Sequence, residues 1–312
     1  MSIKHNNCST IRALSLKIAE LTGFNLNKQI TATLLAECPD QPGIIAKVTD
    51  FLAKKNANIV DLEQHVDVTD QHFFMRVEWQ LSDTNVNRES LEKEFSEYVG
   101  SVLKMNWSIA YSNLKPRLAI FVSQHGHCLF DILSRYQAGE WNVDIPLIIS
   151  NHKNYQSSAE NAGIDFHYIP INADNKQQQE STQLALLAEH RIDTIVLARY
   201  MQILSANFID HYPHQIINIH HSFLPAFPGA KPYHSAHERG VKIIGATSHY
   251  VTTELDAGPI IEQDIVRIRH NDHVEDLKRK GQDNEKIVLS RAIRHHLQNE
   301  VLVYKNRCIV FD

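Results

Sequence analysis

The sequence predicts an α/β protein in which a doubly wound, mostly parallel sheet follows a smaller ferredoxin-like βαββαβ domain. Residues 29–112 read as strand, helix, strand, strand, helix, strand, which is the βαββαβ order. From residue 116 onward, apolar strands alternate with helices, as is typical of a parallel sheet. The short stretch SNLKPRL, which contains Pro116, separates the two patterns.

The composition is that of a globular protein and argues against two classes of partner. The chain has 312 residues, is 43% hydrophobic and 21% charged, and carries a formal net charge of −5. Nucleic-acid binding needs a concentrated basic surface, and no run of lysine and arginine longer than three residues occurs. No apolar stretch approaches the roughly 18 residues that span a bilayer. We therefore expect neither a nucleic acid nor a membrane as a partner.

The cysteines indicate neither a disulfide framework nor a zinc site. Cys8, Cys38, Cys128 and Cys308 are scattered, and no C-x-x-C pair occurs. This usage is typical of reduced thiols in a cytoplasmic protein.

Residues 1–28 precede the first predicted strand. They contain no acidic residue before Glu20, and their apolar residues at positions 11, 14, 18 and 21 have helical spacing. We interpret them as an N-terminal extension. A transit peptide shares this acid-poor, amphipathic character and is the alternative.

The smaller domain, residues 29–112, is predicted from its hydrophobic periodicity. Strands are predicted at 29–38, 60–68, 72–81 and 104–112. The first helix carries Ile44, Val48, Phe51 and Leu52 on one stripe, and the second carries Leu91, Phe95, Tyr98 and Val99.

The turn DQPGI at residues 40–44 resembles the D-x-x-G-I turn of the ACT domain family. The order of strands and the helix stripe agree with that family over residues 29–112. The resemblance implies that the domains pair edge to edge, which makes the protein a homo-oligomer. It also implies an amino-acid effector, bound where two ACT domains pair.

The larger domain, residues 116–312, alternates strands with helices. Strands are predicted at 117–123, 144–151, 165–171, 192–198 and 214–220, with a helix after each of the first four and a further helix and hairpin over 283–312. In such sheets ligands bind at the carboxyl ends of the strands. Neither G-x-G-x-x-G nor G-x-x-x-x-G-K-[ST] occurs, so these two modes of nucleotide binding are unsupported.

Asn218 and His220 lie two residues apart at the end of the predicted strand 214–220. Side chains alternate across a strand, so both point to one face and can approach one substrate atom. His221 points to the other face unless the strand has already ended. An isolated N-x-H pair can also serve only to bind backbone groups of the following loop.

A second polar segment, SHYVTTELDAGP, covers residues 248–259 and is predicted as a strand followed by a tight acidic loop. The Gly-Pro after Asp256 suits a loop that brings a carboxylate into a cleft, although an aspartate in a turn is ordinarily a turn former. Metal chelation by His220, His221, His249 and Asp256 is a further alternative. No H-E-x-x-H motif or cysteine pair supports it, and we expect no metal.

Together the two segments resemble the formyltransferase family that uses 10-formyltetrahydrofolate. Its motifs N-x-H-x-S-x-L-P and V-T-x-x-L-D-x-G-P occur at residues 218–225 and 251–259. The resemblance covers about residues 116–300 and implies that Asn218, His220 and Asp256 are catalytic. It also implies that the folate is the substrate, with no separate cofactor.

The residue types suit this chemistry. Attack on a formamide carbon places negative charge on its oxygen, which the Asn218 amide and a protonated His220 can stabilise. Asp256 can favour the imidazolium and can take and return protons.

The stretch VLARYMQILS, residues 196–205, resembles the family's L-A-x-x-M-x-I-L-S run along the pterin pocket. The resemblance implies that Met201, Ile203 and Leu204 bind folate, with Arg199 at a variable place beside them. Plain core packing is the alternative for the apolar residues.

The acceptor of the formyl group is indicated by other positions. Family members that act on glycinamide ribonucleotide have a Gly-rich phosphate loop after the first strand, whereas residues 123–129 here read SQHGHCL. His127 in this loop, His221 where transferases usually have proline, and the ACT-like domain resemble the hydrolytic deformylase branch. There water is the acceptor, and the products are formate and tetrahydrofolate.

The resemblance implies an enzyme that balances the one-carbon folate pool and supplies formate for purine biosynthesis. Formyl transfer to an amine such as glycinamide ribonucleotide is the alternative. His127, His221 and His249 are candidate supporting residues in either case.

Overall fold

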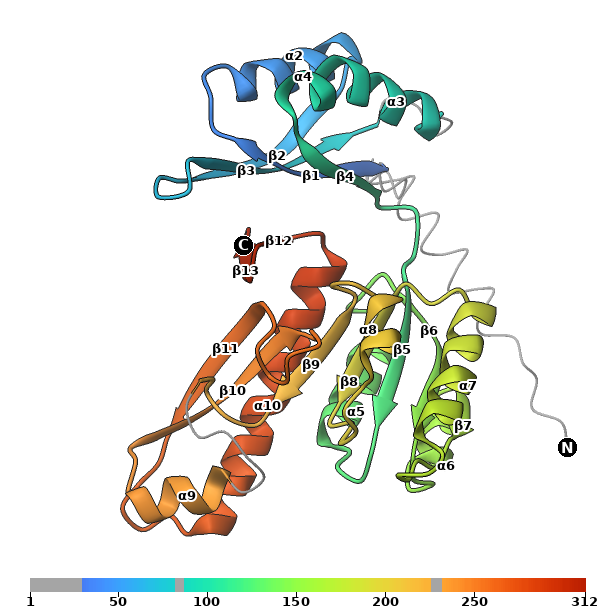
Figure 1. The fold of residues 1–312 in the computed structure, drawn as a ribbon, viewed down its shortest axis with the longest axis vertical. Helices are drawn as coiled ribbons and strands as arrows, with labels where there is room; N and C mark the ends of the chain where they lie inside the picture. The colour runs from blue at the N-terminus through green and yellow to red at the C-terminus, as the bar shows by residue number, and fades with distance from the viewer. Residues whose placement is uncertain (1–29, 82–86, 226–231) are drawn as a thin grey trace, which may run out of the picture. The chain divides into compact units, whose positions relative to one another are not determined.

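The computed structural model describes residues 30–81, 87–225 and 232–312, so the predicted extension at 1–28 lies outside the described residues. The chain divides into two compact units, one ending at Asn113 and the other beginning at Leu114, both drawn in Figure 1. None of the helices in the described ranges is long and apolar enough to cross a membrane.

The first unit is a four-stranded antiparallel sheet with helices on one face, which is the predicted ferredoxin-like arrangement (Figure 1). Its strands are β1 (Thr31–Pro39), β2 (Asn58–Asp67), β3 (His72–Gln80) and β4 (Asn106–Tyr111), in the order β2-β3-β1-β4. Its helices are α2 (Ile44–Lys54), α3 (Arg88–Phe95) with a π-helical turn at Ser96–Gly100, and α4 (Ser101–Leu103).

Hydrophobic stripes explain how these helices pack. The predicted stripe of the first helix is confirmed, because Ile44, Val48, Phe51 and Leu52 are the buried residues of α2. In the second helical segment Leu91, Phe95 and Val99 are buried. Tyr98 differs from its prediction and stays 36% exposed. Its hydroxyl donates to Asp50 at 2.6 Å, a bond that favours the surface over the core for this amphipathic side chain.

The second unit is built on a seven-stranded sheet in the order β11-β10-β9-β8-β5-β6-β7. Its strands are β5 (Arg117–Val122), β6 (Asp144–Ser150), β7 (Asp165–Tyr168), β8 (Thr194–Ala198), β9 (Ile216–His220), β10 (Ile243–Tyr250) and β11 (Ile260–Arg267). β5 to β9 pair in parallel, and β10 and β11 pair antiparallel. A hairpin of β12 (Val301–Tyr304) and β13 (Arg307–Val310) follows.

Helices cover both faces of this sheet, as in a doubly wound fold. They are α5 (His127–Ala138), α6 (Gln156–Asn161), α7 (Lys176–Glu189), α8 (Ala206–Asp210), α9 (Pro232–Arg239) and α10 (Val274–Leu297). Leu118 and Ile120 of β5 share a buried cluster with Val288 of α10. Their neighbours Ala119 and Phe121 share another with helices α7 and α8. Alternate residues of one strand therefore face two cores.

The strand order reverses on either side of β5, which continues to β6 on one edge and borders β8 on the other. Ligands of such sheets bind outside the carboxyl ends of the strands at this point. The loops after β5 and β8 meet there, and the Met201 backbone N–H donates to Ser123 Oγ at 3.1 Å. The fold thus places a site at the ends of β5, β8 and β9.

Three local features differ from the sequence-based expectation. The strand predicted to start at Ser248 begins at Ile243 and ends at Tyr250. Strand β11 and helix α9 had no counterpart in the prediction. β11 completes an antiparallel edge on a parallel sheet, and alternation of strands with helices cannot indicate such a hairpin.

Candidate active site

Strand β9 delivers Asn218 and His220 to the carboxyl edge of the sheet, and it ends at His220. The antiparallel neighbour β10 places His249 directly opposite Asn218 and Thr247 opposite His220. Thr247 Oγ1 donates to the Ser222 carbonyl at 2.9 Å and accepts from the Leu224 N–H at 3.0 Å. This buried hydroxyl therefore fixes the loop that follows His220.

The loop after β10 brings Asp256 to His220. The carboxylate Oδ2 lies 3.3 Å from His220 Nδ1, and Oδ1 lies 3.8 Å from His249 Nε2. A Cβ on Gly258 would lie 1.8 Å from the Tyr250 carbonyl oxygen, so only glycine lets the loop approach the strand this closely. Asp256 itself has φ of 54°, a left-handed conformation that non-glycine residues adopt mainly where surrounding structure enforces it.

The protonation of this pair follows from its geometry. The hydrogen bond from His220, together with the charge of that ring, holds the pKa of Asp256 below its usual value. An ionised carboxylate only accepts, so His220 presents its Nδ1–H to Asp256. The other ring nitrogen, His220 Nε2, is buried and has no hydrogen-bond partner. This nitrogen is therefore left to contact a substrate.

His249 orients Asn218 through its tautomer. Its Nδ1 lies 2.9 Å from the Tyr250 carbonyl, which can only accept, so Nδ1 carries the proton. Nε2 is then an acceptor and receives Asn218 Nδ2–H at 3.2 Å. Burial lowers the pKa of His249, which keeps the ring neutral and this arrangement intact. The second hydrogen of the Asn218 amide remains to donate elsewhere.

His221 lies beyond the end of β9 and so escapes the strand alternation. Its ring stacks on His220, with centroids 5.1 Å apart and an interplanar angle of 21°. Its Nδ1 lies 2.5 Å from Arg199 Nη1. Burial, helped by the Arg199 charge, lowers the pKa of His221 to about 4. A neutral His221 therefore accepts from Arg199 at Nδ1 and carries its proton on Nε2.

The four residues predicted to bind folate fall into three environments. Met201 and Ile203 are 55% and 63% exposed, so their apolar surfaces are accessible. Leu204 is buried in the core beside α8. The Arg199 side chain is only 10% exposed, and its φ of 62° is left-handed. The structure therefore separates the residues that one sequence run had grouped.

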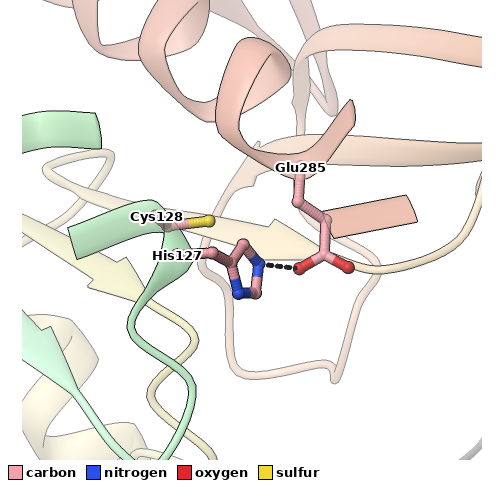
Figure 2. Close-up of side chains that lie close together, drawn as sticks. All are labelled: His127, Cys128 and Glu285. Atoms are coloured by element: carbon pink, nitrogen blue, oxygen red, sulfur yellow. Dashed lines mark hydrogen bonds and ion pairs between the residues drawn. The ribbon is translucent and has the colours of Figure 1, made fainter. Parts of the chain in front are cut away.

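His127, the first residue of α5, contacts a residue that sequence reasoning missed. Its Nε2 lies 2.8 Å from Glu285 Oε2, and Figure 2 shows the pair beside Cys128. Glu285 lies on α10, three and four residues before the buried Val288 and Leu289. An acidic residue on the apolar face of a helix is a signal that could have identified it.

His127, Cys128 and Glu285 also have ligand atoms within 4.8 Å of one another, as a metal site requires. The surrounding groups disfavour a cation there. Both Glu285 oxygens already have donors, Tyr233 at 2.8 Å and His127 at 2.8 Å. Arg199 adds a positive charge at 3.4 Å, and burial raises the pKa of the Cys128 thiol. These contacts fit an ion-pair network better than a metal centre.

The comparisons with known proteins agree with both units. The model of the formyl transferase family matches residues 116–293, and that of the ACT domain matches residues 32–88. The formyltetrahydrofolate deformylase of Synechocystis sp. is 54% identical over 284 residues, which cover 91% of this chain and 99% of that protein.

Solved structures show the same relationship. The crystal structure of a formyltetrahydrofolate deformylase from Pseudomonas syringae pv. tomato has a TM-score of 0.90 and 42% identity, covering 96% of this chain and 100% of that one. Glycinamide ribonucleotide transformylase 1 from Symbiobacterium toebii has a TM-score of 0.60 and 30% identity, covering 64% of this chain and 95% of that one.

Proposed function

Because the chain belongs to the formyltetrahydrofolate deformylases, we propose that it hydrolyses 10-formyltetrahydrofolate to tetrahydrofolate and formate. The observation that carries the proposal is the pairing of Asp256 with His220, which leaves a buried, unpartnered Nε2 on the strand that also carries Asn218. Such a set of groups suits attack on a formamide carbon.

In the proposed reaction, water attacks the formyl carbon and negative charge develops on the formyl oxygen. His220 Nε2–H and the free Asn218 amide hydrogen donate to that oxygen, and the Asp256 carboxylate stabilises the His220 imidazolium. Asp256 accepts a proton from the attacking water. Cleavage of the bond between the formyl carbon and N10 then releases formate, and N10 takes up a proton. No step needs a cofactor beyond the folate substrate.

We propose that folate binds to the exposed apolar side chains of the loop that follows β8. Met201 and Ile203 are accessible and can contact an aromatic ring system, as such pockets generally do. Arg199 and Leu204 support this loop, Leu204 by packing in the core and Arg199 through its contact with His221.

Amine acceptors are the weaker proposal. The transformylase structure covers only 64% of the chain described here, whereas the deformylases match across both units. The deciding experiment supplies purified protein with 10-formyltetrahydrofolate alone. We expect catalytic release of formate. Turnover that occurs only after an amine such as glycinamide ribonucleotide is added would refute hydrolysis.

An effector site and an oligomer are proposed for the first unit. A cavity of about 550 Å³ is lined by Asp40, Gln41 and Gly43 of the predicted turn together with Gln64 and Val66 of β2. Its carboxylate and amide groups suit an amino acid. β2 and β4 are the edge strands of the sheet, and unpaired edges can pair with a second copy. Light scattering should therefore give a mass above that of one chain.

A cytoplasmic location is proposed from the cysteines, since Cys38, Cys128 and Cys308 are free thiols. Formate released there would be available for purine biosynthesis, and hydrolysis would regenerate tetrahydrofolate for the one-carbon pool.

A further inference from the structure

Helix α7 has polar side chains at two of its three buried positions. Its buried residues are Glu180, Gln183 and Leu187, which are spaced three and four apart and therefore lie on one face of the helix. Glu180 is 5% exposed and Gln183 is fully buried. Burial of a polar group costs free energy unless the group forms hydrogen bonds, so both polar side chains require partners in the fold.

The hydrogen bonds of both side chains reach the loop that follows β8. Glu180 Oε1 accepts the Ser205 backbone N–H at 3.0 Å, and Gln183 Nε2 donates to the Tyr200 hydroxyl at 3.0 Å. Ser205 also caps α8 with its own hydroxyl. We call residues 200–205 the folate loop, and its two ends are bound to the same face of α7.

Between these two anchors the folate loop exposes the side chains that are proposed to contact folate. Met201 is 55% exposed and Ile203 is 63% exposed, whereas Tyr200 and Leu204 are buried. Exposed side chains have few packing contacts that could hold them in one place. The position of the apolar surface therefore depends on how the backbone of the loop is held.

The two anchors differ in chemistry. Lys176 lies 3.9 Å from Glu180 Oε1 and is 40% exposed, so solvent screens this ion pair, and the closer Ser205 N–H is the main partner of that oxygen. Gln183 Oε1 has no hydrogen-bond partner among the described residues. What this side chain gains from being polar is therefore its bond to Tyr200.

We propose that Glu180 and Gln183 are positioning residues for the folate substrate, because they hold the folate loop in the conformation that presents Met201 and Ile203. They act through the loop rather than on the reacting atoms, and the inference rests on the proposed function. Without an anchor the loop populates other conformations, and the apparent affinity for folate falls with the fraction of the competent one. Loss of an anchor should therefore weaken binding and spare the chemical step.

The first test removes the anchor at Ser205. Glu180→Ala should raise KM for 10-formyltetrahydrofolate about tenfold and leave kcat within about twofold, because it deletes a hydrogen bond to a charged group that acts on binding alone. Glu180→Gln keeps an acceptor oxygen and should bring KM back to within about threefold of the wild type. The dissociation constant of tetrahydrofolate, measured by fluorescence titration, should rise together with KM.

The second test removes the anchor at Tyr200. Tyr200→Phe deletes the hydroxyl and keeps the ring, which packs edge-on against Phe121 with centroids 5.1 Å apart. The dissociation constant of tetrahydrofolate should rise about threefold, because a hydrogen bond between neutral groups is worth less. Adding Gln183→Leu removes the donor left unpaired, so the double variant should bind no more weakly than Tyr200→Phe. This pair of variants decides if Glu180→Ala does not fold.

Ile164→Ala is the matched control for a general loss of stability. Ile164 is 4% exposed and belongs to the buried cluster shared with α10, on the other face of the sheet from α7. This variant should lower the melting temperature and change neither KM nor kcat. Wild-type KM in Glu180→Ala, equal KM in Glu180→Gln and Glu180→Ala, or an equal rise in KM in Ile164→Ala would overturn the proposal. A wild type that binds tetrahydrofolate but releases no formate would instead refute the hydrolysis, and the dissociation constants would still test the two anchors.

Discussion

The two sides of His220 are built in different ways. On one side, Asp256, Asn218 and His249 come from one strand pair and the loop that follows it, within about forty residues of sequence. On the other side, His221 is held by residues from α5, the loop after β8 and α10, which lie far apart in the chain. The first side has a short sequence signature, and the second exists only in the folded protein.

The two sides also differ in charge. Asp256 keeps its negative charge because its pKa is lowered by His220, whereas His221 is kept neutral beside an arginine. His220 therefore has an anion on one side, and on the other a neutral ring that contacts the ion pair of Arg199 and Glu285. The other groups assigned to the proposed reaction, Asn218 and Asp256, both lie on the first side.

The largest expected effect is at Asp256. Asp256→Asn removes the charge and the proton acceptor, and asparagine tolerates the left-handed backbone of this position. General acid–base groups typically contribute on the order of 10²–10⁴-fold, so formate release should fall by about 10³-fold. Folate affinity, measured by fluorescence titration, should change little. Equal turnover in the two proteins would remove Asp256 from the mechanism.

Asn218→Ala should have the next largest effect. It deletes one oxyanion donor, which costs about 10²–10³-fold in kcat in other enzymes. The loss should appear in kcat rather than KM, because the interaction forms mainly in the transition state. Steady-state kinetics separate the two constants. A rise in KM with kcat preserved would mean that Asn218 only binds substrate.

As pH falls, protonation of His221 should reduce the stability of the fold before protonation of Asp256 does. The pKa of His221 is about 4 in the folded protein, against a usual 6.5. A lowered histidine pKa means that its stabilising contribution is complete above about pH 6.5 and is lost as pH falls towards 4. At about pH 5 this loss is about 2 kcal/mol of the free energy of unfolding. Urea denaturation at about pH 5 and above about pH 6.5 measures this difference in the free energy of unfolding.

Burial also lowers the pKa of His296 to about 4, so this residue adds to the acid sensitivity of the wild type. The His221→Asn variant separates the contribution of His221 to the acid sensitivity from that of His296. It should lose less stability than the wild type between neutral and acid pH. An identical pH dependence in the two proteins would contradict a neutral His221.

The smallest kinetic effect is expected at His249, which acts through Asn218. His249→Leu leaves the Asn218 amide without its acceptor, and one hydrogen bond is worth about 1 kcal/mol, so kcat should fall by about fivefold. His249→Gln offers a new acceptor and should recover part of the loss. If both variants lose the same activity, His249 has a structural role only.

The sequence predicted both folds because periodicity is strong in the elements that matter. The stripe of α2 and the continuous apolar run of β5 appear directly as burial. It also predicted that Asn218 and His220 share a face, since this needs only a two-residue repeat. The position of His221 could not be predicted, because it depends on where β9 stops.

Other features depend on tertiary contacts alone. The sequence around Arg199 gives no indication of its left-handed backbone conformation. The family motif groups Arg199 with Met201 and Leu204, but in the structure Met201 is exposed and Leu204 is buried. The link from His127 to Glu285 spans 158 residues. Single-sequence periodicity has no means of pairing residues over that distance.

The central claim is that water attacks the formyl group at the Asn218, His220 and Asp256 site. The most direct test is a single turnover of 10-formyltetrahydrofolate in water enriched in heavy oxygen, with no amine present. We predict formate that carries one solvent oxygen, formed by the wild type and about 10³-fold more slowly by Asp256→Asn. A formyl group that stays on the folate until an amine is supplied, and is then recovered as a formamide, would contradict the account.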